Sequence, residues 1–205
     1  MVKMKVTLED YNNRTEEMEA TSAAIHYSSK PKNLDLIKAM KGRKHLATFR
    51  SAYAVIKIEC ISTIGTIQLL RTNLADMIYS DNHLLKSQRY VNQSERDFVV
   101  PQCEYIDATD VRGLAVDMFE DINRVSKEYY NSLIRLGVKK EDARFALTRA
   151  VTTDLYIAGN MQMWSQFLKL RTDKHAQWEI RAIANEIALV LSEKFPRIME
   201  EFIQR

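Results

Sequence analysis

The chain of 205 residues is poor in the two residue types that most often form turns, with only 5 glycines and 3 prolines. An average composition would supply roughly 24 of them. This shortage disfavours a many-stranded sandwich or barrel, because such folds need many tight turns. It also leaves little room for a Gly-rich phosphate loop, and no GxGxxG or P-loop motif occurs. A nucleotide, if one binds, must therefore be held by side chains.

Cysteine and histidine are scarce as well. Cys60 and Cys103 form no CxxC pair, and the four histidines lack metal-ligand spacing. These absences exclude a disulfide framework and a zinc ribbon, and we expect no metal site. The longest uncharged run, residues 155–168, is shorter than the ~20 residues that span a bilayer. With no signal-peptide pattern at the start, the sequence predicts a soluble cytoplasmic protein without a membrane partner.

An excess of either charge is also lacking. The 30 Lys and Arg residues and 27 Asp and Glu residues give a net charge of +3. A nucleic-acid binder usually carries a one-sided basic stripe, so we expect no nucleic-acid partner. Hydrophobic residues at 46% and charged residues at 28% are typical of a globular protein. The mildly basic balance suits an enzyme that handles small anionic ligands.

The residue pattern predicts an α+β fold, mostly helical, with a small mixed or antiparallel sheet. Period-2 alternation predicts a strand over 2–8, and a run rich in β-branched residues predicts a strand over 53–59. Helical periodicity predicts helices at about 15–27, 33–40, 62–74, 108–136, 139–147, 161–170 and 175–194. Asn33 is expected to cap the second helix, whereas Gly137 and Pro196 are expected to end two later ones. Without a linker or repeat, residues 1–205 are predicted to form one domain.

The helix predicted over 108–136 carries a long apolar stripe. Its members recur every three or four residues along one face and are Leu114, Met118, Ile122, Val125, Tyr129, Leu133 and Leu136.

Three arginines stand among apolar neighbours, at positions 71, 144 and 171. A guanidinium cannot be neutralised, so it rarely sits in an apolar pattern without an anionic partner. Each alone suits a structural salt bridge. Together, the three indicate convergence on a phosphate or carboxylate.

One segment of the chain resembles a known family. Residues 166–180 read QFLKLRTDKHAQWEI. They resemble the signature of flavin-dependent thymidylate synthases, which reads Asn-x-x-x-Leu-Arg, a short turn and His-Ala-Gln-Trp-Glu-Ile. Further matches follow the order of the family: QLLR at 68–71, SQRYV at 87–91, Ala143-Arg144 and Asn160.

The resemblance implies an enzyme that makes dTMP from dUMP. Methylenetetrahydrofolate donates the carbon, NADPH reduces a bound FAD, and the reduced flavin supplies the hydride. The family forms homotetramers whose active sites are shared between subunits. It uses no cysteine of the enzyme as a nucleophile, which agrees with the ordinary sequence setting of Cys60 and Cys103.

The same resemblance implies roles for individual residues. The residues expected to bind dUMP are Gln68, Arg71, Ser87, Gln88, Arg89, Arg144 and Arg171. Among them, Arg89 and Arg144 are expected to hold the phosphate. Arg171 is expected to be catalytic, because a fixed guanidinium stabilises the ionised uracil and makes its C5 a better nucleophile. The residues expected to contact FAD are His45, Arg71, Thr72, Asn73, Asn160 and Gln166.

The sequence departs from the family pattern at one motif. The family's Arg-His-Arg becomes Arg71-Thr72-Asn73, and an insertion within 75–84 lengthens the interval to Ser87. Two alternatives therefore stay open. The first is a related enzyme that modifies C5 of another pyrimidine nucleotide. The second is a non-catalytic nucleotide-binding homologue that has lost its redox chemistry.

Overall fold

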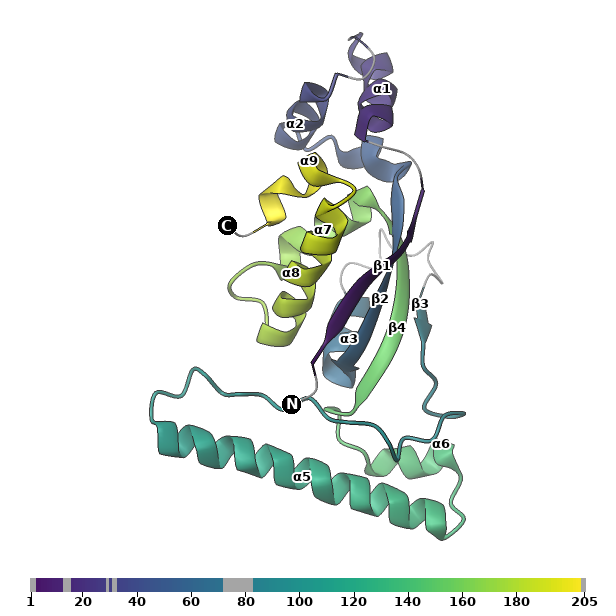
Figure 1. Cartoon of the computed structure of the whole chain (residues 1–205), viewed down its shortest axis with the longest axis vertical. Coiled ribbons are helices and arrows are strands. Elements are labelled where there is room, and N and C mark those ends of the chain that lie inside the picture. The colour runs from purple at the N-terminus through teal and green to yellow at the C-terminus, as the bar shows by residue number, and fades with distance from the viewer. Residues whose placement is uncertain (1–2, 13–15, 29, 31–32, 72–82, 204–205) are drawn as a thin grey trace. The chain divides into compact units, whose positions relative to one another are not determined.

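A computed structural model describes residues 3–12, 16–28, 30, 33–71 and 83–203. The strands are β1 (Lys5–Tyr11), β2 (Tyr53–Ser62), β3 (His83–Leu85) and β4 (Thr152–Asn160). They form one sheet in the order β1-β2-β4-β3 (Figure 1). The α-helices are α1 (Glu16–Tyr27), α2 (Asp35–Gly42), α3 (Thr63–Leu70), α5 (Thr109–Arg135), α6 (Lys140–Ala143), α7 (Met161–Arg171), α8 (Trp178–Ser192) and α9 (Pro196–Met199). The fold is α+β and mostly helical, as the sequence predicts.

The chain divides into two compact units. The first unit comprises residues 1–5, 59–67 and 85–155. The second unit comprises residues 6–58, 68–84 and 156–205. A single domain over residues 1–205 stays a prediction.

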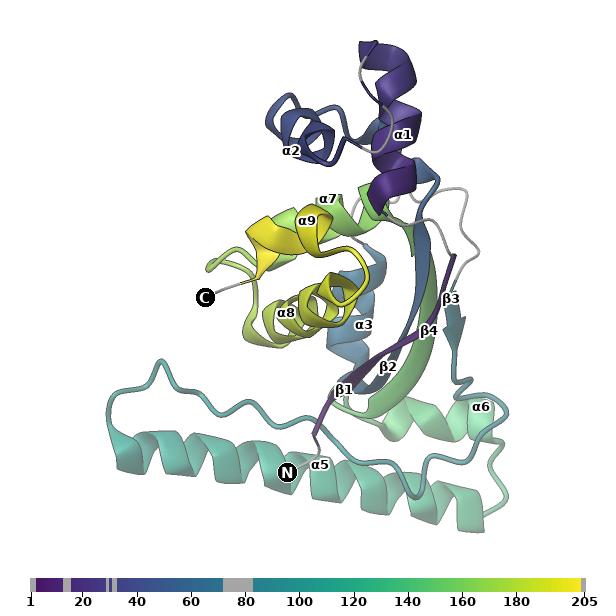
Figure 2. The same cartoon turned by 45° about the horizontal axis from the view of Figure 1, so that its top comes forward.

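The second unit has an apolar core built from β2 and from α7, α8 and α9. Ile56, Trp164, Ile183 and Phe195 are almost completely buried. Figures 1 and 2 show the three helices gathered on one side of the strands. The Trp164 ring meets Phe167 edge-on, with 6.0 Å between ring centroids, which is a favourable aromatic geometry. This packing fixes α7, which carries residues 166–171 of the signature segment.

Two amide side chains begin the helices of the signature segment. The Asn160 Oδ1 atom accepts a hydrogen bond from the Met163 backbone N–H at 2.9 Å, at the start of α7. The Gln177 Oε1 atom accepts hydrogen bonds from the N–H groups of Glu179 and Ile180, at the start of α8. Such caps satisfy backbone donors that have no partner inside the helix. Gln177, a residue of the signature segment, therefore has a structural task at the start of α8.

The first unit is organised around α5. The helix ends as predicted at Gly137, whose φ of 85° lies in the left-handed region. The side of α5 that faces the rest of its own unit is polar, with Asn123, Ser126 and Tyr130 buried. The Ser126 hydroxyl donates to the Ala146 carbonyl at 2.8 Å. Hydrogen bonds therefore replace much of the apolar packing that usually fixes a helix to its unit.

The apolar stripe of α5 points away from these contacts. Leu114 is 62% exposed, Met118 65% and Tyr129 65%, and Ile122, Val125 and Leu136 are exposed too. Leu133 is half-buried. The stripe predicted from the sequence is thus present on one face, and that face does not pack against the described residues of its own unit.

Some predicted boundaries are wrong. The first strand is β1 at Lys5–Tyr11 rather than 2–8, and the helix expected over 139–147 is split into α6 and a 3-10 turn at Arg144–Ala146. The helix expected over 62–74 corresponds to α3 at Thr63–Leu70 and to a turn at Arg71, whereas residues 72–74 lie outside the described residues. Pro196 begins α9 as well as following α8, because proline fits the first turn of a helix.

Two other sequence predictions need correction. Asn33 is not the capping residue of α2, because Leu34 holds that position and makes no side-chain capping bond. The Asn33 Oδ1 atom instead accepts from the Asp35 N–H at 3.2 Å. Strand β4 was absent from the prediction. Its residues alternate between buried and less buried, but Asp154 and Gly159 weaken the strand pattern.

Asp154 ties β4 to two other segments of the first unit. Its Oδ1 atom accepts from the Cys60 backbone N–H at 3.1 Å, and its Oδ2 atom accepts from Arg96 Nη2 at 2.9 Å. Lys86 Nζ lies 3.7 Å from the same carboxylate. Burial would raise the pKa of Asp154, but the Arg96 hydrogen bond and the Cys60 N–H hold this pKa below its ordinary value.

We expect Arg96→Met to lower the free energy of unfolding by about 1–3 kcal/mol near neutral pH, because a half-buried carboxylate loses a charged partner. A lowered folded-state pKa contributes stability above the unfolded value near 4, and that contribution is lost as the pH falls through the folded value. The difference between variant and wild type in urea unfolding should therefore shrink toward about pH 3. Exposed Arg149→Met is the matched control. A difference independent of pH would contradict this account.

Candidate functional site

The predicted site residues fall into two groups, one in each unit. Gln68, Arg71 and Arg171 belong to the second unit, with His45, Asn160 and Gln166. Ser87, Gln88, Arg89 and Arg144 belong to the first unit. Thr72 and Asn73 lie outside the described residues.

Arg171 and Gln68 meet in the second unit. Arg171 is the last residue of α7, and Gln68 lies in α3. The Arg171 Nη2 atom donates to the Gln68 main-chain carbonyl at 3.0 Å. Burial lowers the pKa of Arg171, but a guanidinium stays charged throughout the physiological range. The structure thus holds a permanent, half-buried cation in a fixed place. Arg71, just beyond α3, is exposed.

Three of the expected flavin residues lie on α7, at its start, or next to the 3-10 helix that packs against α7. Asn160 caps α7, and its carbonyl oxygen is engaged by the Met163 N–H. Its amide NH₂ can still donate two hydrogen bonds. Gln166 is half-buried on α7. His45 is exposed and precedes the 3-10 helix Leu46–Arg50, which packs against α7.

Ser87, Gln88 and Arg89 form a turn after β3. The Ser87 hydroxyl accepts from the Arg89 N–H at 3.2 Å, and its carbonyl accepts from the Val91 N–H at 3.0 Å. Serine side chains often stabilise turns in this way. Gln88 is half-buried, whereas Arg89 is exposed and projects from the turn.

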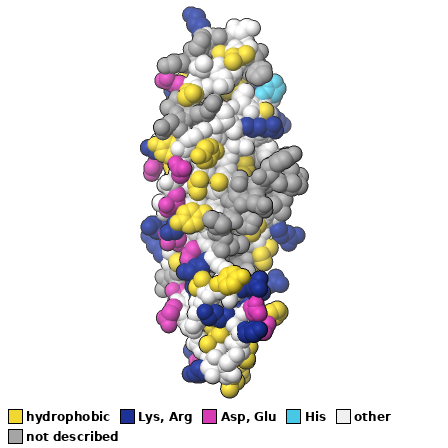
Figure 3. All heavy atoms as spheres, turned by 90° about the vertical axis from the view of Figure 1, so that its right-hand side faces the viewer, with side chains coloured by type: hydrophobic (Ala, Val, Ile, Leu, Met, Phe, Trp, Pro, Cys, Tyr) yellow, Lys and Arg dark blue, Asp and Glu magenta, His cyan; other side chains and the backbone are white. Residues whose placement is uncertain are grey.

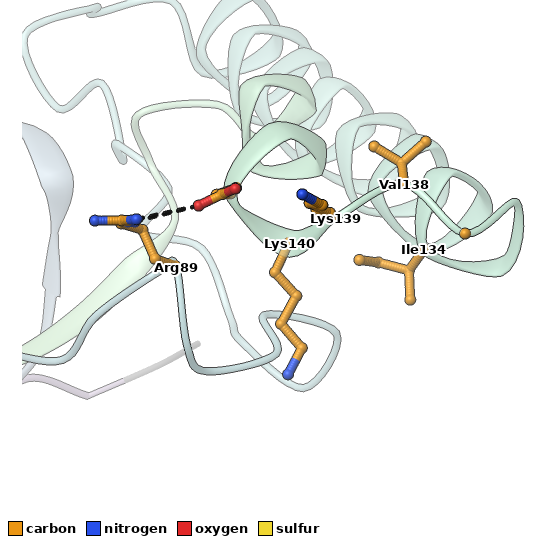
Figure 4. A pocket seen from close by; sticks show the side chains of 7 residues that line it. Arg89, Ile134, Val138, Lys139 and Lys140 are labelled. Carbon is orange, nitrogen blue, oxygen red and sulfur yellow. Dashed lines mark hydrogen bonds and ion pairs between the residues drawn. The ribbon is translucent and has the colours of Figure 1, made fainter.

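Glu141 joins the two arginines expected to bind phosphate. Its Oε2 atom accepts from Arg89 Nη2 at 3.2 Å, the contact marked by a dashed line in Figure 4. Its main-chain carbonyl accepts from Arg144 Nε at 2.9 Å. This bond uses one of the five N–H groups of the guanidinium. One residue of α6 therefore contacts both arginines.

An open pocket of about 460 Å³ lies beside this pair. The residues that line it are Arg89, Ile134, Gly137, Val138, Lys139, Lys140 and Glu141 (Figure 4). Lys140 Nζ also donates to the Tyr90 carbonyl at 3.2 Å, which ties α6 to the Ser87–Val91 turn. Three cations and one carboxylate thus border one hollow, an arrangement suited to an anion.

The turn that follows Arg171 is organised by His175 and Asp173. The His175 backbone N–H and its Nδ1 atom contact Asp173 Oδ1 at 2.8 and 2.9 Å. These hydrogen bonds hold the pKa of Asp173 below its ordinary value. Because both side chains are exposed, their evident task is to shape the turn.

Sequence reasoning missed Glu141, Lys140 and Tyr130 as parts of this site. Tyr130 is fully buried, and its hydroxyl accepts from the Gln93 N–H at 3.1 Å, just beyond the Ser87–Val91 turn. The sequence pattern gave Glu141 no role in the site. The Arg89–Glu141 pair spans 52 positions, so no local pattern reveals it.

Surface charge, groups of metal-ligating residues and long apolar helices can each indicate a binding partner. On the face shown in Figure 3, Lys and Arg side chains are interspersed with Asp and Glu side chains. Across the described ranges, no three His, Cys, Asp or Glu residues gather as metal ligands would. No helix in that part of the chain is both long and apolar enough to cross a bilayer.

Comparison with known proteins gives one consistent result. A family model described as "Thymidylate synthase complementing protein" matches residues 7–197. A flavin-dependent thymidylate synthase of Thermosipho africanus is 31% identical over 144 residues, which cover 70% of this chain and 60% of that protein. The chain therefore spans less than two thirds of this relative.

Two further relatives carry the same name. The protein of Geobacter sulfurreducens is 33% identical over 159 residues, with 77% of this chain and 64% of that protein covered. The protein of Pyrococcus furiosus is 29% identical over 199 residues, with 88% and 76% covered.

The fold and the arginines of the candidate site define an α+β protein with candidate anion-binding positions in each unit. The family model matches nearly the whole chain, from residue 7 to residue 197, and this match shows the family. This chain belongs to the thymidylate synthase complementing protein family.

Proposed function

We propose that this protein is a flavin-dependent thymidylate synthase, which converts dUMP to dTMP by reductive methylation. Methylenetetrahydrofolate is the proposed carbon donor, FAD the cofactor and NADPH its reductant. The observation that carries the proposal is the fixed guanidinium of Arg171, held by the Gln68 carbonyl within the signature segment. The names of the relatives support the flavin.

Arg171 is the proposed catalytic residue. Loss of the uracil N3 proton leaves negative charge on the ring, and a permanent cation beside it stabilises that charge. The ring then carries more electron density at C5, the carbon that must bond to the incoming methylene group. Because Arg171 is already anchored, little reorganisation is needed at the moment of reaction.

Arg89 and Arg144 are proposed to hold the dUMP phosphate, with Ser87 and Gln88 as neutral partners. Guanidinium groups bind phosphate through two parallel charge-assisted hydrogen bonds. Arg144 is half-buried and already oriented through its Nε atom, and Arg89 projects from its turn. Gln68 and Arg71 complete the proposed dUMP contacts.

The described residues fit a flavin ring in their chemistry. Asn160, Gln166 and His45 offer neutral hydrogen-bonding groups, which suit the carbonyl and imide groups of that ring. The Asn160 cap leaves its two amide hydrogens to donate. When bound, reduced FAD supplies a hydride. Arg71, Thr72 and Asn73 are also proposed to contact it.

The proposed partner is the chain itself, in a homotetramer with shared active sites. The exposed apolar stripe of α5 supports this proposal, because large apolar surfaces on one helix face mark association sites. A cytoplasmic setting is also proposed, since Cys60 and Cys103 are both free thiols.

The test is an assay of the full chain with dUMP, methylenetetrahydrofolate, FAD and NADPH. We expect dTMP as the product and a flavin absorption band that survives desalting. A product other than dTMP would favour a different C5-modifying enzyme. A colourless protein that binds dUMP without turnover would favour a non-catalytic homologue and overturn the proposal.

A further inference from the structure

The anion pocket of the first unit contains a carboxylate where a phosphate is proposed to bind. Both the Nε and Nη2 atoms of Arg89 lie within 3.4 Å of Glu141 Oε2. The ion pair is partly exposed, with 55% of the Arg89 side chain and 39% of the Glu141 side chain accessible to solvent. An incoming anion therefore meets Arg89 already paired and a negative charge already present.

Glu141 also orients the second proposed phosphate arginine. Its carbonyl accepts from Arg144 Nε, so the carboxylate and the carbonyl of one residue serve two guanidinium groups. This main-chain contact does not depend on the side chain at position 141. Glu141→Gln therefore changes the charge in the pocket while it keeps the size of the side chain and the carbonyl that orients Arg144.

We propose that Glu141 is a specificity-determining residue that makes this pocket prefer a nucleotide with one phosphate over a nucleotide with two. The inference rests on the proposed function. At about pH 8, a phosphate monoester carries a charge near −2, since its second pKa is about 6. A second phosphate group adds about one negative charge. Arg89, Lys139 and Lys140 attract the phosphate at this pocket, and Glu141 repels each negative charge that a second phosphate group adds.

The size of the effect follows from Coulomb's law. For charges about 7 Å apart in water, each added unit of ligand charge changes affinity by a factor of about three. Removing the Glu141 charge should therefore strengthen the binding of dUDP more than that of dUMP. The informative quantity is the ratio of the two dissociation constants, because a general loss of packing alters both.

The experiment is calorimetric titration of the full chain with dUMP and with dUDP, at fixed ionic strength and without Mg²⁺. Wild type should bind dUMP more tightly, and Glu141→Gln should lower the dUDP-to-dUMP ratio of dissociation constants by about threefold or more. Asp142→Asn is the matched control, because it removes the same charge from the next residue of α6, outside the pocket lining. Its ratio should stay close to that of wild type.

The possible outcomes distinguish an error in the role of Glu141 from an error in the proposed function. If wild type binds dUMP and Glu141→Gln leaves the ratio unchanged, the inference about Glu141 is wrong and the proposed function stands. The inference is equally wrong if Asp142→Asn lowers the ratio as much, since the effect then comes from net charge alone. If wild type binds neither nucleotide, the proposed function and this inference both fail.

Discussion

Replacing Arg171 with alanine should reduce turnover of dUMP by about a hundredfold to a thousandfold or more. The side chain supplies the cation proposed to stabilise the ionised uracil, and removing one donor of that kind costs about 3–4 kcal/mol of transition-state stabilisation. The measurement is kcat for dTMP formation at saturating dUMP. Flavin retention and subunit assembly should be unchanged, because the hydrogen bond from Arg171 to Gln68 joins two segments within one unit.

Two further variants sharpen this test. Lys169→Ala removes an exposed cation from the same last turn of α7 and should leave kcat near that of wild type. Arg171→Lys keeps the charge but loses the planar fork of donors, so it should restore only part of the rate. Turnover of Arg171→Ala at the wild-type level would show that its assigned catalytic role is wrong.

Loss of the hydrogen bond to Gln68 provides a check on folding. The bond is a charged donor to a main-chain carbonyl in a half-buried place, so its removal should cost about 1–3 kcal/mol of unfolding free energy. Urea unfolding measures this cost separately from kcat. A catalytic role of Arg171 thus appears as a change in kcat, whereas a structural role appears as a change in the free energy of unfolding.

The sequence predicts a helix well where helical periodicity continues over many residues and a helix-terminating residue follows it. Helix α5 lies within a residue of its predicted bounds, because seven apolar residues repeat and Gly137 adopts the left-handed conformation that ends the helix. Strand β4 was missed because its alternation is short and is interrupted by Asp154, whose partners come from distant segments. Whether such a segment forms a strand depends on its pairing with distant segments, and the local residue pattern does not show that pairing.

Contacts between distant segments also limit how much of the candidate site the sequence can predict. Arg171 was assigned to the site because the signature segment fixes both residue types and their spacing, and Asn160 was assigned because it is a further match in the order of the family. Glu141 was not, because its importance comes from a pair with Arg89 that only the fold creates. The sequence also located the stripe on α5 but not the partner of that stripe, since periodicity shows that a face is apolar and not what covers it.

Placing charge in the α5 stripe should break the proposed homotetramer. We expect the double variant Met118→Lys with Ile122→Lys to lose the wild-type assembly, which is predicted to contain four copies of the 23.8 kDa chain. Buried interface residues of this size contribute about 2 kcal/mol each, so the dissociation constant should rise roughly a thousandfold. Sedimentation velocity measures the mass directly. Turnover should fall with assembly, because the proposed active sites are shared between subunits.

The fold of each copy should survive this change. Met118 and Ile122 are 65% and 58% exposed, whereas Asn123, Ser126 and Tyr130 hold α5 to its own unit from the other side. Helix content by circular dichroism should therefore match that of wild type. Asp117→Lys with Glu120→Lys is the control, since both residues are exposed on α5 but lie off the stripe. A double variant of the stripe that keeps the wild-type mass would show that another surface joins the copies.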